Sequence, residues 1–190
     1  MRPCAPIVAT QVSSFPKLLF ERVGMTDTIS GIASQCDLFL CVECGKCVAA
    51  CPMTEIFEDF SYEISPRGMI EKTLMDFDVL TDIGIWFCLT CDVCTEICPA
   101  GVRYRDFVEG VRQLALREGL TEHGLFCQRC GGFFLPRHTL EYISEQLEDG
   151  TVPDEYLTFC PRCRKYDFGE KVKEAIPGRR KALLKRVVKL

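Results

Sequence analysis

Two cysteine-rich segments of the same form constrain this chain more than any other feature of its sequence. They read CVECGKCVAACP over 41–52 and CLTCDVCTEICP over 88–99, so both follow the pattern C-x2-C-x2-C-x3-C-P. In this pattern a short loop presents three thiolates to one iron–sulfur cube, and the cysteine before the proline serves the cube of the other loop. The sequence therefore predicts two 4Fe–4S clusters with crossed ligands. Cluster A is expected on Cys41, Cys44, Cys47 and Cys98, and cluster B on Cys88, Cys91, Cys94 and Cys51.

The high cysteine count has two common explanations, disulfide bonds in an oxidising compartment or thiolate ligands in a reducing one. Twelve of the fourteen cysteines lie in clusters with two or three residues between neighbours. This spacing directs several sulfur atoms at one centre and favours metal binding over disulfides. Zinc or a coincidental grouping is the alternative for the two quartets, and two complete copies, each ending in proline, argue against it.

The composition describes a soluble globular protein, with 47% hydrophobic residues and a net charge of −4. This charge balance does not suit a nucleic-acid-binding surface, so nucleic acid is not an expected partner. No stretch approaches the roughly 18 consecutive apolar residues of a membrane span, and prolines interrupt the first 20 residues. No membrane span and no export signal are therefore expected, which predicts a cytoplasmic location.

Two helices are predicted around the cysteine quartets. Ser65 and Pro66 form a helix-start signal, and the apolar spacing that follows predicts a helix over Pro66–Phe77. An apolar face that ends at Gly119 predicts a second helix, Tyr104–Glu118. The 36 residues between the two quartets leave room for a full helical segment. A mainly α fold, the α-helical ferredoxin with two cluster loops, is therefore favoured over the small β-hairpin ferredoxins.

A third cysteine group follows the quartets and is made of two C-x2-C pairs about thirty residues apart. Four thiolates in this arrangement suit a tetrahedral, structural zinc ion, and Gly131 permits a tight turn around it. A third iron–sulfur cluster or a rubredoxin-like mononuclear iron remains open, because thiolate spacing alone does not select the metal. A helix over Thr139–Leu147 is expected between the pairs. The expected ligands are Cys127, Cys130, Cys160 and Cys163.

Four regions are expected in a chain of this length, which suits one ordinary domain with a small appendage. They are an N-terminal arm (1–35), a helical two-cluster ferredoxin domain (36–119), a zinc-ribbon-like module (120–169) and a basic tail (170–190). Residues 171–190 carry eight lysines and arginines against one acid, with apolar residues between them. Docking to an acidic partner is the favoured interpretation of the tail, and a solvated end or a membrane-surface helix are the alternatives.

From about Cys36 to Glu118, the chain resembles the small two-cluster iron–sulfur protein of the heterodisulfide reductase family. The resemblance is carried by CVECGKCVAACP, SPRGMIEKTL and FCLTCDVCTEICP with the helix that follows. In that family this small protein relays electrons from a flavin-bearing subunit to a cysteine-rich catalytic one. The resemblance thus implies an electron-transfer subunit of a multisubunit oxidoreductase in an anaerobe, with those two subunits as partners. Related modules serve succinate and fumarate reductases and glycerol-3-phosphate dehydrogenases, so the terminal reaction stays open.

The third cysteine group departs from the usual pattern of that small iron–sulfur protein and resembles the zinc-ribbon tails of iron–sulfur subunits in some hydrogenase-like complexes. A redox- or oxygen-sensing regulatory or assembly protein is the rival function, and a free soluble ferredoxin is a third. No nucleophile paired with a base and no glycine-rich phosphate loop is found, so no catalytic site is expected. Cys4 and Cys36 are expected to be free thiols, and His123 and His138 to have surface or structural roles.

Overall fold

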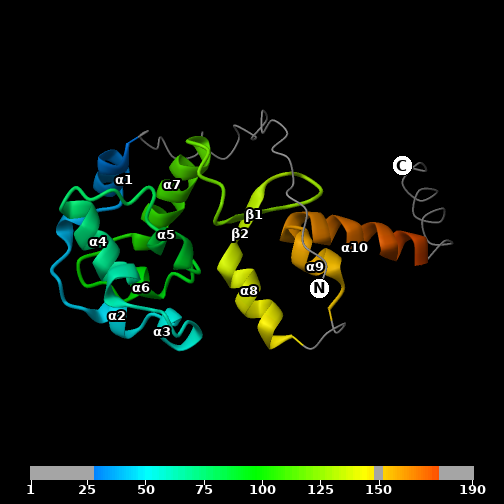
Figure 1. Ribbon diagram of the computed structural model, residues 1–190, viewed down its shortest axis with the longest axis horizontal. Coiled ribbons are helices and arrows are strands. Elements are labelled where there is room, and N and C mark those ends of the chain that lie inside the picture. The colour runs from blue at the N-terminus through cyan, green and yellow to red at the C-terminus, as the bar shows by residue number, and fades with distance from the viewer. Residues whose placement is uncertain (1–27, 148–151, 176–190) are drawn as a thin grey trace, which may run out of the picture.

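The computed structural model describes residues 28–147 and 152–175, which form a mainly helical protein with one small two-stranded sheet (Figure 1). The mainly α fold class is therefore confirmed. Most of the expected N-terminal arm and of the basic tail lies outside the described residues. The elements are α1 (Ile29–Gln35), η2 (Leu38–Leu40), α2 (Lys46–Ala49), α3 (Met53–Ile56), η3 (Tyr62–Ile64), α4 (Pro66–Leu74), α5 (Gly84–Phe87), α6 (Val93–Glu96), α7 (Tyr104–Arg117), β1 (Gly124–Phe126), β2 (Phe133–Pro136), α8 (Arg137–Gln146), α9 (Asp154–Thr158) and α10 (Pro161–Ala175). None of the described helices is long and apolar enough to cross a membrane.

The hydrophobic core lies among α1, α4, α5 and α7, which occupy one side of the molecule in Figure 1. Helix α7 contributes one continuous apolar face, as its periodicity predicts. Its buried side chains pack on α1 and α5 and so support the short segments that carry the cysteines. The largest fully buried side chains are Trp86, Phe107, Ile32, Leu38, Met69 and Ile85.

Helix α4 begins where the sequence predicts and ends three residues earlier. The Ser65 hydroxyl accepts a hydrogen bond from the Gly68 N–H at 3.1 Å, and Pro66 is the first helical residue. Asp76 then adopts a left-handed conformation (φ 61°), and the Phe77 N–H donates to the Lys72 carbonyl at 3.0 Å. This pair of features closes the helix as a Schellman motif. Phe77 therefore lies outside the helix and is exposed, although its spacing fits the apolar face.

Helix α7 also ends in a Schellman motif, and its last residue is Arg117, one residue before the predicted end at Glu118. Gly119 has a left-handed conformation (φ 85°), and the Leu120 N–H donates to the Ala115 carbonyl at 2.9 Å. The glycine is needed here because this conformation strains residues with a Cβ atom. The sequence therefore identified Gly119 correctly as the residue that stops the helix.

The other side of the molecule contains the β-hairpin and helices α8 to α10 (Figure 1). Strands β1 and β2 pair antiparallel, with Leu125 opposite Leu135 and an irregularity after it. Helix α8 begins directly after β2, two residues earlier than the helix expected from sequence, and ends at Gln146. Helix α10 runs without a break past residue 170, where the sequence analysis placed the start of the basic tail.

Aromatic contacts join the two sides of the molecule. The His138 ring of α8 stacks on the Phe87 ring of α5, with centroids 4.2 Å apart, and the Phe57 ring meets both. The preceding residue of α5, Trp86, packs edge-on against Phe133 of β2, with ring centroids 5.7 Å apart. The hairpin and α8 are therefore anchored on α5, the helix that leads into the second cysteine quartet.

His138 is expected to make stability depend on pH. Burial, together with the nearby charge of Arg112, lowers the pKa of its imidazole from 6.5 to about 4. The unfolded chain therefore binds the proton more readily, so stability is complete above pH 6.5 and is lost as the pH falls from 6.5 towards 4. The loss is about 1–2 kcal/mol once partial exposure is allowed for, or a few °C in Tm.

Thermal unfolding of the anaerobic holoprotein between pH 5 and pH 7.5 checks this expectation. The His138→Phe variant keeps an aromatic ring on Phe87, and it removes a ring nitrogen, Nε2, that is buried without a hydrogen-bond partner in the described structure. Its Tm should fall less steeply with acid than that of the wild type. Parallel Tm curves for the two proteins would show that another group is responsible.

Candidate metal centres

The two cysteine loops share one backbone conformation, although their intervening residues differ. In the first loop the residues before and after the second cysteine, Glu43 and Gly45, have φ values of 57° and 72°. Thr90 and Asp92 occupy the same places in the second loop, with φ values of 54° and 70°. Left-handed residues that alternate with ordinary ones turn successive N–H groups to one side, which creates a concave site for negative charge. Helices α2 and α6 begin directly after these turns.

The first hollow lies against the first loop and is lined by cysteines of both quartets. Arg67 and Ile70 of α4 form another part of its wall, together with Tyr104 from the start of α7. The cysteines that line the first hollow are Cys41, Cys44, Cys47, Cys94 and Cys98. The structure therefore brings together the four cysteines expected to hold cluster A.

The second hollow lies against the second loop and is lined by Cys51, Cys88, Cys91 and Cys94. Cys51 belongs to the first quartet, so the cysteine before each proline reaches the hollow of the opposite loop. Cys94 and Tyr104 line both hollows, which therefore share a wall. The structure brings each expected ligand set together, and the assignment of these sets to clusters stays a prediction.

The thiols of these two loops ionise only with difficulty unless a positive charge lies beside them. Burial, together with the neighbouring Cys88 and Cys91, raises the pKa of Cys94 to about 12. Burial is also the main cause that raises the pKa of Cys47, Cys51 and Cys88. Thiolates at these positions need a cation to stabilise them, and iron in an iron–sulfur cube supplies that charge. The donor set therefore fits two cubes.

The segment Ser65–Gly68 supports the wall of the first hollow. Gly68 allows α4 to approach η3 closely, because a Cβ atom at this position would lie 2.1 Å from the Tyr62 carbonyl oxygen. The Ser65 hydroxyl donates to that same carbonyl at 2.6 Å. Arg67, which lies between them, is 7% exposed and forms part of the hollow wall.

The Gly68→Ala substitution is expected to lower the free energy of unfolding by about 1–3 kcal/mol, because the added methyl group meets backbone atoms that must shift. Gly169 of α10 offers a matched control, since a Cβ atom there meets nothing within 4 Å. Gly169→Ala should be neutral or stabilising by up to about 1 kcal/mol, as alanine favours helix. Thermal unfolding of both variants measures the contrast, and equal Tm values would contradict the close approach at Gly68.

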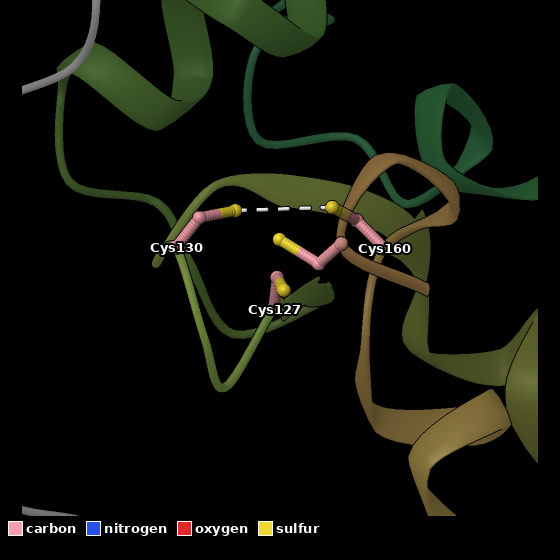
Figure 2. A group of neighbouring side chains, drawn as sticks. Cys127, Cys130 and Cys160 are labelled. Carbon is pink, nitrogen blue, oxygen red and sulfur yellow. Dashed lines mark hydrogen bonds between the residues drawn. The ribbon is translucent and has the colours of Figure 1, made fainter. Parts of the chain in front are cut away.

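The third cysteine group forms a separate centre, in which Cys127 and Cys130 lie between β1 and β2 while Cys160 and Cys163 lie at the start of α10 (Figure 2). All four sulfur atoms lie within 4.8 Å of one another, and the Sγ atoms of Cys130 and Cys160 are 3.8 Å apart. A tetrahedral ion with metal–sulfur bonds of about 2.3 Å has sulfur–sulfur distances of about 3.8 Å. In the second pair, Cys160 directly precedes α10 and Cys163 lies in its first turn, so this pair is not part of a second hairpin.

The separation of these sulfur atoms favours a single ion over a third cube. In a cube each thiolate binds a different iron, so the ligand sulfurs lie farther apart than they do around one ion. Gly131 has a left-handed conformation (φ 70°), and its N–H donates to the Cys127 carbonyl at 2.8 Å. This confirms the tight turn expected after Cys130. Cys127 and Cys163 are buried, whereas Cys130 is exposed.

The remaining cysteines and the two histidines take no part in these centres within the described residues. Cys36 is buried in the core and unpaired, and burial raises the pKa of its thiol to about 11. Cys4 lies outside the described residues. His138 has the structural role expected of it. Sequence analysis did not single out Arg67 and Tyr104 as site residues, although Arg67 belongs to the quoted SPRG segment.

Comparison with known families supports the first two centres. Residues 37–102 match the family model of the 4Fe-4S dicluster domain, and this range contains both quartets and the segment between them. The match ends before the third cysteine group, which it does not describe. No curated protein matches the chain. The matched domain together with the cysteine motifs identifies an iron–sulfur protein.

Proposed function

We propose that this protein is an electron-transfer subunit of a multisubunit oxidoreductase and carries two 4Fe–4S clusters. The observation that carries the proposal is that two hollows, each lined by one crossed set of four cysteines, share the wall formed by Cys94 and Tyr104. When bound, the clusters supply one-electron oxidation and reduction. The chain holds them side by side and partly covers six of their eight ligands, which suits repeated electron transfer.

The third centre is proposed to hold one structural zinc ion. Four thiolates at tetrahedral separations close the site, so no position is left open for substrate. Its place between the hairpin and the start of α10 suggests that the ion holds these segments together. The hairpin in turn packs on Trp86 through Phe133, so the ion supports a surface next to the second hollow.

The partners proposed from the heterodisulfide reductase resemblance are a flavin-bearing subunit and a catalytic subunit, in the cytoplasm of an anaerobe. The module is proposed to relay electrons between them without substrate chemistry of its own. The basic tail is proposed as a docking element, and only its first residues, up to Ala175, lie in the described part of α10.

Metal analysis of anaerobically purified protein tests the function first. About eight iron, eight sulfide and one zinc per chain are expected, with low-temperature EPR spectra of two interacting clusters after reduction. About twelve iron without zinc would make the third centre an electron-transfer site. Iron well below eight in intact protein would overturn the two-cluster proposal.

Redox sensing is the second candidate, because Cys44 and Cys91 are exposed and leave one side of each hollow open to solvent. A sensor is expected to lose a cluster within minutes in air and to purify without large subunits. A relay is expected to purify with stoichiometric partner subunits and to survive repeated cycles of reduction and oxidation. Co-purification under anaerobic conditions separates the two functions.

A further inference from the structure

Each hollow is lined by one arginine, and the two arginines differ in burial. Arg67 lines the first hollow and is 7% exposed, whereas the Arg105 side chain in the second hollow is 42% exposed. A charge screened by water acts weakly on its surroundings, while a buried charge acts strongly. The first hollow therefore has a cation in its wall whose field is little screened.

Arg67 also contacts a cysteine sulfur directly. Its Nη1 atom lies 3.9 Å from Cys41 Sγ, and its Nη2 atom forms an ion pair with the Glu43 carboxylate at 2.7 Å. The Glu43 side chain is 71% exposed, so solvent weakens the opposing effect of its charge. An arginine guanidinium is not deprotonated in folded proteins. Arg67 therefore remains a cation.

Arg105 makes no comparable contact among the described residues. Its guanidinium pairs with Asp92 at 3.5 Å and with Glu109 at 3.2 Å, and both partners are carboxylates. Asp92 itself lines the second hollow. The wall of the second hollow thus has a cation and an anion, whereas Lys46 adds a second cation to the wall of the first.

A buried cation also lies near the second set of cysteines, because Arg112 is 5% exposed and donates to the Ile85 and Cys88 carbonyl oxygens. Arg67 differs from Arg112 in that it contacts a cysteine sulfur.

The fold holds Arg67 in place on both sides. Ser65 caps α4, and the ring of Pro66 fixes the φ angle of the first helical residue. Gly68 allows this first turn to pack closely against the Tyr62 carbonyl. Because the Arg67 backbone is fixed in this way, its guanidinium keeps its position when the charge in the first hollow changes. It therefore stabilises the reduced, more negative state of the site without reorganisation.

We propose that Arg67 is a positioning residue that raises the reduction potential of cluster A. The inference rests on the proposed two-cluster function. One-electron reduction adds one negative charge to the site of Cys41, and the Arg67 N–H donates to the sulfur that shares this charge. Hydrogen bonds to ligand sulfurs and local charge are among the factors that set the potentials of iron–sulfur clusters.

EPR-monitored redox titration of the full-length holoprotein tests the inference with Arg67→Gln. Cluster A is assigned as the signal that disappears in Cys44→Ala. At the wild-type midpoint of cluster A, the ratio of reduced to oxidised cluster should fall about tenfold, because the variant lacks the cation beside a ligand sulfur that is more negative in the reduced state. A tenfold change corresponds to a shift of about 59 mV in a one-electron couple. The midpoint of cluster B should not move.

Two further variants separate electrostatics from structural damage. Glu43→Gln removes an opposing charge and should shift the cluster A midpoint upwards, in the direction opposite to Arg67→Gln. Arg105→Gln removes an exposed arginine from the other hollow and should move both midpoints much less. If Arg67→Gln does not load cluster A, the upward shift in Glu43→Gln still tests the inference.

The failures of this inference and of the proposed function are distinguishable. Eight iron and two EPR signals with an unmoved cluster A midpoint in Arg67→Gln, or equal movement of both midpoints, would overturn the role of Arg67 alone. A downward shift in Glu43→Gln would do the same. Iron well below eight in the wild type would overturn the proposed function and this inference together.

Discussion

Replacement of Cys98 by alanine is expected to remove the cluster of the first loop, although Cys98 itself belongs to the second quartet. The reason is geometric, since Cys98 lines the first hollow with Cys41, Cys44 and Cys47 and does not line the second. Loss of one of four thiolates should reduce the iron content from about eight to about four per chain. The EPR spectrum of reduced Cys98→Ala should then match that of Cys44→Ala.

The reciprocal variant gives an internal control for the crossing. Cys51 lines the second hollow and not the first, so the spectrum of Cys51→Ala should match that of Cys91→Ala. Cys36→Ala, which removes a buried thiol outside both hollows, should keep eight iron. If Cys98→Ala instead matches Cys91→Ala, each quartet serves its own cluster and the crossed assignment is wrong.

The second large effect is expected at the third centre, where Cys163→Ser should release the zinc ion and unfold the segments around it. Structural zinc sites contribute apparent binding free energies of about 10–16 kcal/mol, so a weakened site loses several kcal/mol of local stability. The hairpin and α10 bury few other large side chains, and Tyr166 and Phe168 of α10 are exposed. These segments therefore have little else to hold them together.

Hydrogen exchange and metal analysis of the Cys163→Ser holoprotein measure this effect. Backbone amides in 124–136 and 161–175 should exchange much faster than in the wild type, whereas those of α7 should stay protected and the iron content should stay near eight. Cys36→Ala again serves as the control and should retain zinc. Unchanged exchange in the hairpin after loss of zinc would show that its packing on Trp86 suffices without the metal.

Features encoded over a few residues could be predicted from sequence. The spacing within each quartet, the Ser65–Pro66 helix start and the Gly119 stop act through neighbouring backbone atoms, and each was found where it was expected. The end of α4 was misplaced because the apolar spacing continues to Phe77, while the left-handed turn at Asp76 stops the helix first. Aspartate tolerates that conformation, but its presence does not require it.

Contacts between distant segments could not be predicted in the same way. Arg67 reaches the sulfur of Cys41, which lies 26 positions earlier, and the two hollows share Tyr104 although no spacing rule involves this residue. His138 could only be expected to have a surface or structural role until α8 was seen to stack it on Phe87. These contacts depend on how helices pack, and many packings are compatible with one periodic pattern.

The sequence by itself therefore determined which cysteines can act together, because the spacing of thiolates along a short loop sets which sulfur atoms can point at one centre. Only the tertiary structure decided where the centres lie relative to one another and which charged side chains lie beside them. It placed the two hollows against a common wall, Arg67 beside only one of them, and the third centre under the hairpin that packs on Trp86. The physical reason is range: ligand spacing acts through a few covalent bonds, whereas burial and electrostatic fields depend on segments that meet only when the whole chain has folded.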